Sequence, residues 1–234
     1  MCTYEDEILS VFFFQWLIHN FHTIISNRAI LEVVMRTTPF SPPGDRRVTN
    51  PSSDRRLIEQ SHLLQTALSA SILLHLYPKS KITVTVMVLA DDGGRLEAAI
   101  NAATLALMDA GIPLKDMVCA CSAGRWSAGG SDEIVVDLNR REIQAATGSA
   151  GGGGGGGTSD MIYLPVATMP QRGTVVLAQC ESRLSSATEA FGDVLEVAMK
   201  GCQMVMEIMA AAVRARGAGV WKAKEGKADI MLME

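Results

Sequence analysis

The sequence predicts a mixed α/β domain in which helices pack onto the strands that alternate with them. Three observations support this fold class. A β-branched run at residues 82–89, ITVTVMVL, lies between two stretches with helical spacing of apolar residues. The glycine pair Gly93-Gly94 separates that run from the second of those stretches. A third helical stretch, with one long apolar stripe, follows near the end of the chain.

Composition fits one domain with a substantial core. The chain has 234 residues, 48% of them hydrophobic and 20% charged, so it is not disordered as a whole. Its net charge of −4 provides no global positive field, so polyanion binding requires a local basic patch. The five cysteines show no CxxC or Cys/His spacing, which suits a reducing compartment and argues against structural zinc. We expect no metal and no cofactor.

The first 27 residues differ in composition from the rest. Residues 8–18, ILSVFFFQWLI, are mostly apolar but too few to span a bilayer, which takes roughly 20 residues. Acidic residues precede this run, whereas a signal peptide has a basic segment there. We therefore expect no membrane contact. The residues alone leave two interpretations open: a segment foreign to the domain, or a buried amphipathic helix.

The expected elements follow from local patterns of apolar, capping and turn residues. They are, in order, a strand at 28–40, a helix at 54–77, a strand at 82–89, a helix at 96–110, strands at 117–123 and 134–138, a hairpin of 161–167 with 174–179, and a helix at about 186–216.

Turn and cap residues set the expected boundaries in the first half. The loop at 41–53 is rich in Pro and Gly and continues no regular element. Asp54, or Ser53 before it, can cap the first helix, and Pro78 would end that helix. Gly111 ends the second helix.

The second half contains a glycine tract and the last helix. Residues 148–160 form a Gly-rich insertion in a loop, and this tract is no phosphate-binding P-loop because no strand precedes it and no helix follows it. Ser186 and Glu189 have capping-box spacing at the start of the last helix. We expect residues 217–234 to form a Lys-rich, frayed tail.

Two basic or glycine-rich places could bind an anion. Asp92-Gly93-Gly94 precedes a helix, where backbone N–H groups favour phosphate, although ordinary turns share this pattern. Five arginines against two acids give residues 36–56 a local charge of +3; these are Arg36, Arg46, Arg47, Arg55 and Arg56, against Asp45 and Asp54. Such a cluster can follow a nucleic-acid backbone, or it can be a solvated loop.

Two further places have weaker signals. Asp137 ends a hydrophobic strand, where it can be a general acid, a metal ligand or a turn residue. Cys119 and Cys121 lie on one face of a strand without a basic neighbour in sequence, which indicates buried, unreactive thiols.

Residues 90–124, ADDGGRLEAAINAATLALMDAGIPLKDMVCACSAG, resemble the central block of RNase PH-type exosome core subunits. SSDRRLIEQ, LYPKSKITVTVMVL and VVDLN fit the same family in the same order, and the likeness covers residues 28–216. The resemblance implies an RNase PH-like βαβ domain with a mixed sheet and packed helices. It also implies a ring of six such subunits around a pore. Active members of the family degrade RNA from its 3′ end with inorganic phosphate as the nucleophile.

The chain departs from the family at the positions that perform this reaction. The family holds phosphate with a Thr-Arg pair after its Asp-Gly-Gly turn, where this chain has Arg95 and Leu96. The family's pair of metal-supporting acids corresponds here to Asp137 and Ile143. An aliphatic side chain removes both charge and metal ligation. The resemblance therefore implies no catalytic residues, a vestigial Asp137 and a vestigial phosphate site at Gly93, Gly94 and Arg95.

The same resemblance implies that the chain keeps the family's RNA-binding arginines. Arg46, Arg47, Arg55 and Arg56 match the family's basic loop and arginine pair, which would hold single-stranded RNA at the channel entry. The implied partners are other RNase PH-type subunits in a hexameric ring, cap subunits and an associated hydrolytic nuclease. The implied role is rRNA maturation and mRNA turnover in nucleus, nucleolus and cytoplasm.

The N-terminal segment is the larger departure. The family has a strand-rich stretch where this chain has residues 1–27, and an alternative start or intron sequence read as coding would give this pattern. We then expect a sheet without its opening strands and with an unpaired edge. Two other functions stay open: an active phosphorolytic 3′ exoribonuclease with a rearranged site of Arg95, Asp137 and Glu142, or a truncated non-functional gene product.

Overall fold

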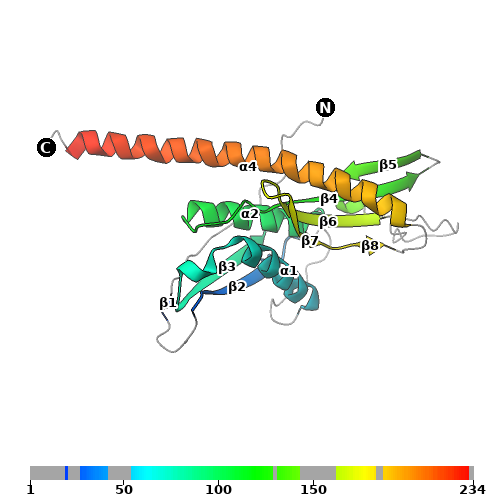
Figure 1. Ribbon diagram of the computed structural model, residues 1–234, viewed down its shortest axis with the longest axis horizontal. Helices are drawn as coiled ribbons and strands as arrows, with labels where there is room; N and C mark the ends of the chain where they lie inside the picture. Colours follow the sequence, from blue (N-terminus) through cyan, green and yellow to red (C-terminus); the bar gives the residue numbers. More distant parts are fainter. Residues whose placement is uncertain are drawn as a thin grey trace.

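The computed structural model describes residues 19–20, 27–41, 54–128, 131–142, 162–182 and 187–231. Its elements are β1 His19–Asn20, β2 Ile30–Thr37, α1 Arg55–Ser71, the short η1 Leu74–Leu76, β3 Ser80–Val88, α2 Arg95–Asp109, β4 Cys119–Ala128, β5 Ser131–Val136, β6 Ile162–Met169, β7 Thr174–Ala178, β8 Glu181–Ser182 and α4 Ala187–Met231 (Figure 1). Within the described residues, no helix combines the length and the hydropathy needed to cross a bilayer.

The first sheet is mixed and has the order β1-β3-β2, so β2 lies at its edge among the described strands. β2 pairs parallel to β3 over its whole length, and β1 pairs antiparallel to the start of β3. Alternate residues of β2 are buried, as the period of two requires. The α1 side chains hold the outer edge of β2: Met35 N–H donates to Ser61 Oγ (3.0 Å), and Gln65 Nε2 donates to the Leu31 carbonyl (2.8 Å).

Helix α1 begins where the sequence predicted but ends earlier. Asp54 is its N-cap, and its carboxylate accepts a hydrogen bond from Arg56 N–H at 3.0 Å. The helix stops at Ser71 instead of Tyr77, so the predicted end was wrong. The reason is tertiary: Lys115 N–H donates to the Ser71 carbonyl (2.7 Å), and Ile72 pairs with Leu114 as an isolated bridge.

The second sheet is antiparallel and has the order β5-β4-β6-β7, with β8 also paired to β6. The predicted β6–β7 hairpin is confirmed. The strand expected at 134–138 is β5, which begins earlier than expected and ends at Val136, so Asp137 lies just beyond it.

The elements form four layers. Helices α1 and α2 lie between the two sheets and contact both, while α4 covers the other face of the second sheet (Figure 1). The main core joins the buried faces of β2 and β3 to α1, α2 and the near side of β4 and β6. A smaller core joins β4 and β6 to α4.

Helix α4 is longer than the sequence indicated. It continues through Gly217 and Gly219 to Met231, so the expectation of a frayed tail from residue 217 was wrong for the described part. Its core stripe is confirmed at Ala198, Cys202 and Met209, which are buried. Ala212, three residues after Met209, is exposed.

Candidate functional site

The turn between β3 and α2 is shaped for glycine. Gly93 and Gly94 have φ angles of 112° and 56°, which side chains rarely allow. A Cβ atom on Gly93 would lie 2.9 Å from the Leu138 carbonyl oxygen and 3.0 Å from Arg140 N. The segment after β5 is therefore packed directly against this turn, and the Arg140 N–H donates to the Asp92 carbonyl.

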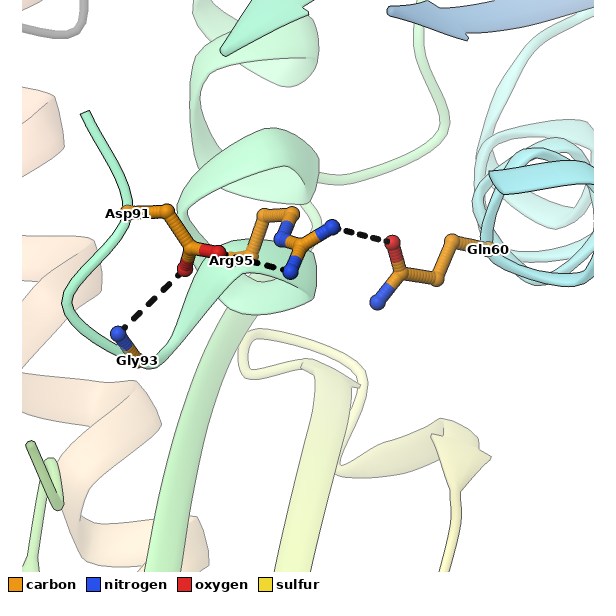
Figure 2. A network of polar contacts seen from close by, with 4 residues as sticks. All are labelled: Gln60, Asp91, Gly93 and Arg95. Carbon is orange, nitrogen blue, oxygen red and sulfur yellow. Dashed lines mark hydrogen bonds and ion pairs between the residues drawn. The ribbon is translucent and has the colours of Figure 1, made fainter. Parts of the chain in front are cut away.

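Arg95, the first residue of α2, is engaged within the turn. Its Nη2 lies 2.7 Å from Asp91 Oδ2, and a longer contact of 3.5 Å joins its Nη1 to Gln60 Oε1 of α1 (Figure 2). Asp91 Oδ1 also accepts a hydrogen bond from Gly93 N–H at 3.4 Å. The Arg95 charge is thus offset by a carboxylate that is itself mostly buried.

Leu96, for which the resemblance implies the second position of a phosphate clamp, is turned away from solvent. It is 7% exposed and belongs to the main core. It therefore offers neither a charge nor a hydrogen-bond donor to an anion at the turn.

Asp137 lies beside the turn. Its φ is 61°, a left-handed conformation that Asp tolerates better than most residues, and its N–H donates to the Ser122 carbonyl at 2.9 Å. Its Oδ1 lies 3.5 Å from the position that a Cβ atom on Gly94 would occupy. The structure thus brings Gly93, Gly94, Arg95 and Asp137 together.

Glu97 is a second carboxylate at this place, and our sequence reasoning missed it. It is 6% exposed, accepts a hydrogen bond from Tyr163 Oη at 3.0 Å, and has Oε2 3.9 Å from the same point beside Gly94. A glutamate in the first turn of a helix is common, so its position gave no signal. Its hydrogen-bond donor, Tyr163, belongs to a strand that is distant in sequence.

Glu142 has a local structural role. Its Oε2 accepts a hydrogen bond from Asn139 N–H (2.8 Å), and Asn139 Oδ1 accepts one from Glu142 N–H (2.9 Å). This reciprocal pair is a capping box, which orders the segment after Asp137. Ile143, the position of the family's second acid, lies outside the described residues. In the described part of the chain, no group of three or more His, Cys, Asp or Glu side chains could hold a metal ion.

The arginine pair lies at the start of α1. Arg55 and Arg56 are both exposed. Gln60 follows Arg56 by one helical turn and contacts Arg95, so this side of α1 faces the glycine turn (Figure 2). Arg46 and Arg47 lie outside the described residues.

The predicted burial of Cys119 and Cys121 is confirmed. Cys119, Cys121 and Cys202 are buried together, at 0%, 7% and 0% exposure, where α4 packs on β4. Burial, with a further contribution from the Cys202 thiol, raises the pKa of Cys119 and of Cys121 to about 12. Burial likewise raises the pKa of Cys202. These thiols therefore stay protonated at neutral pH and are poor nucleophiles.

Comparisons with known proteins agree with the fold. Residues 19–113 match domain 1 of the 3′ exoribonuclease family, RNase PH. The exosome complex component Rrp41 of Thermococcus kodakarensis is 34% identical over 203 residues, which cover 87% of this chain and 72% of that protein. The Rrp41 of Cenarchaeum symbiosum is 34% identical over 212 residues, covering 91% of this chain and 78% of that protein.

Two solved structures share the fold at lower identity. Rrp46 of rice (Oryza sativa) has a TM-score of 0.61 and 20% identity, over 82% of this chain and 76% of that one. The Archaeoglobus fulgidus exosome with RNA bound to the active site has a TM-score of 0.57 and 16% identity, over 83% and 76% of the respective chains.

Proposed function

Because this chain belongs to the RNase PH family of 3′ exoribonucleases, which includes the Rrp41 components of exosome complexes, we propose that it is a non-catalytic exosome core subunit that holds RNA. Its role would be in 3′-to-5′ RNA processing and degradation, including rRNA maturation and mRNA turnover. Another subunit would cut the RNA.

The observation that carries the non-catalytic part is the state of the phosphate clamp. Leu96 is packed into the core, and Arg95 is already paired with Asp91. To bind phosphate, the guanidinium would have to leave a mostly buried carboxylate, which would then lack its partner. The capping role of Glu142 further supports the proposal, because this carboxylate is engaged by Asn139 N–H.

RNA contact would come from the exposed arginines. Arg55 and Arg56 project from the first turn of α1, where guanidinium groups can bind backbone phosphates in bidentate fashion. Arg46 and Arg47 in the preceding loop would extend this contact. The positive charge is local, since the whole chain carries −4.

The assembly we propose is a hexameric ring of RNase PH-type subunits, with cap subunits and an associated hydrolytic nuclease. Such a complex would act in the nucleus, the nucleolus and the cytoplasm. The chain covers about three quarters of the Rrp41 relatives' length, which supports a comparable subunit.

The test is protection of RNA by a reconstituted ring. The chain is assembled with the other RNase PH-type subunits of its source, and single-stranded RNA threaded into the ring is treated with an added ribonuclease. We expect a protected fragment that is lost with Arg55→Glu and Arg56→Glu together. Failure of the chain to enter the ring, or protection unchanged by the two substitutions, would contradict the proposal.

A second candidate is an active phosphorolytic enzyme with a rearranged site. The observation that favours it is the pair of carboxylates, Asp137 and Glu97, that flank Gly94. One or two carboxylates together with substrate phosphates are a usual Mg²⁺ environment. Glu97→Gln would abolish phosphate-dependent RNA degradation if this candidate were correct, whereas our first proposal expects no such degradation in either protein.

A further inference from the structure

A groove of about 740 Å³ lies between the outer edge of β2 and the first turns of α1. Its apolar lining includes Val34, Ile58 and Met87, and Ile58 is 49% exposed. This volume is within the range of about 300–1,000 Å³ that small-molecule pockets span. The groove is therefore large enough for a ligand of nucleotide size.

The groove also carries positive and hydrogen-bonding groups. Arg36 of β2 and His62 of α1 both line it, and both are exposed. Among the described residues, no carboxylate forms an ion pair with Arg36. An unpaired guanidinium next to an apolar wall suits a ligand that has both a phosphate and a flat ring.

The edge of β2 in this groove is poorly suited to an added strand. Two of its backbone groups are already used, since Met35 N–H donates to Ser61 Oγ and the Leu31 carbonyl accepts from Gln65 Nε2. A strand pairing here would have to break both side-chain contacts. A ligand that binds through side chains leaves them intact.

The groove continues the surface that carries the arginine pair. Arg55, Ile58 and His62 follow one another at spacings of three and four residues, so they share one face of α1. Gln60 lies on another face, where it contacts Arg95. Helix α1 thus separates the glycine turn from the groove, and Arg55 lies on the groove side.

We propose that this groove is a nucleotide subsite for single-stranded RNA, an inference that rests on the proposed function. Arg36 and Arg55 bind successive backbone phosphates, and one base packs against Ile58 and Met87. The subsite recognises a base by its apolar face, so it has little preference for sequence.

The test measures the affinity of the full chain for a short fluorescein-labelled single-stranded RNA by anisotropy. Arg36→Glu should weaken binding roughly tenfold through loss of a charge-assisted phosphate contact. Ile58→Ala should weaken binding about fivefold for normal RNA, because it removes apolar area that the base would cover, and leave binding of a matching abasic backbone unchanged. Arg214→Glu is the control, because Arg214 is exposed on α4, which lies on the opposite side of the molecule from β2 (Figure 1).

The results distinguish failure of the nucleotide subsite from failure of the proposed function. If RNA binds and Arg55→Glu with Arg56→Glu abolishes binding, but neither groove variant weakens it, the subsite is wrong and the proposed function stands. Equal losses for Ile58→Ala on normal and abasic RNA also overturn the subsite. If the unmodified chain and the reconstituted ring bind no RNA, both proposals fail.

Discussion

The Asp91 carboxylate lies 2.7 Å from the Arg95 guanidinium, across the turn that leads from β3 into α2. Asp91 and Arg95 are at positions i and i+4, and their ion pair closes the Gly93-Gly94 turn. Gln60 of α1 contacts the same guanidinium. The Arg95 guanidinium thus has a structural role in this chain. It joins the turn to the helix that bears Arg55 and Arg56.

The first prediction concerns that ion pair. Asp91→Ala should lower the free energy of unfolding by about 1–2 kcal/mol, because it removes the partner of a half-buried guanidinium and the acceptor of Gly93 N–H. Urea denaturation measures this change. Glu196→Ala is the matched control: Glu196 and Lys200 are also four residues apart and 2.7 Å from each other, but both are exposed, so the midpoint should hardly move. Equal effects of the two substitutions would contradict the structural role.

The second prediction concerns the fit of the turn against the segment after β5. Gly93→Ala should destabilise the protein by at least about 2 kcal/mol, because it adds backbone strain and a contact of 2.9 Å with the Leu138 carbonyl. Gly173→Ala is the control for strain alone, since Gly173 has a φ of 64° with no atom within 4 Å of its added Cβ. It should cost about 1 kcal/mol. Thermal or urea unfolding that ranks the two in the opposite order would show that the turn is not packed as described.

The position of the Gly93-Gly94 turn was predictable from the sequence. The side chains that lie next to it in space, Asp137 and Glu97, were not. In the sequence, a β-branched run is followed directly by two glycines and then by a helical pattern. These three features predicted β3, the turn and α2. The proximity of Asp137 to the turn had no local signal in the sequence. Glu97 is buried and bonded to Tyr163, 66 residues later, and no local pattern encodes that contact.

Helix ends were the least predictable part of the fold. Pro78 suggested that α1 would continue to Tyr77, but Ser71 is instead bonded to Lys115, which a local pattern does not reveal. Gly217 suggested that α4 would end, yet the helix continues to Met231. Glycine within a helix costs only about 1 kcal/mol, which the neighbouring helix formers can offset.

The third prediction concerns the salt dependence of RNA binding. Replacing Arg55 and Arg56 by Ala removes two phosphate contacts, so the slope of log affinity against log salt should become shallower by about 1.4. The affinity for single-stranded RNA should fall at low salt and differ less from that of the unmodified chain at high salt. Titrations at several salt concentrations measure the slope, with Arg214→Ala as the matched control. An unchanged slope would exclude these two arginines from the RNA contact.

The fourth prediction concerns pH. In the unfolded chain the thiols of Cys119 and Cys121 ionise near 9.0, whereas in the folded chain their pKa is about 12. The unfolded state therefore loses these protons first as pH rises, and stability that is complete below pH 9 decreases between pH 9 and 12. By pH about 10.5 the loss should approach roughly 2 kcal/mol per thiol.

Urea unfolding at increasing pH checks this thiol effect. The decrease should be smaller in Cys121→Ala, even if that variant is less stable at every pH because it loses packing volume. Cys180→Ala is the control, because Cys180 is exposed. Identical pH dependence in Cys121→Ala, Cys180→Ala and the unmodified chain would contradict the contribution of the buried thiols.

The most direct test of the central claim is phosphorolysis. The chain, alone and in a reconstituted ring, is incubated with 3′-labelled single-stranded RNA and inorganic phosphate, and released nucleoside diphosphates are measured. We predict RNA binding with no release above the level of a ring that carries Asp137→Asn in this chain. Phosphate-dependent release that Asp137→Asn abolishes would show that the chain is an active exoribonuclease and would contradict the account.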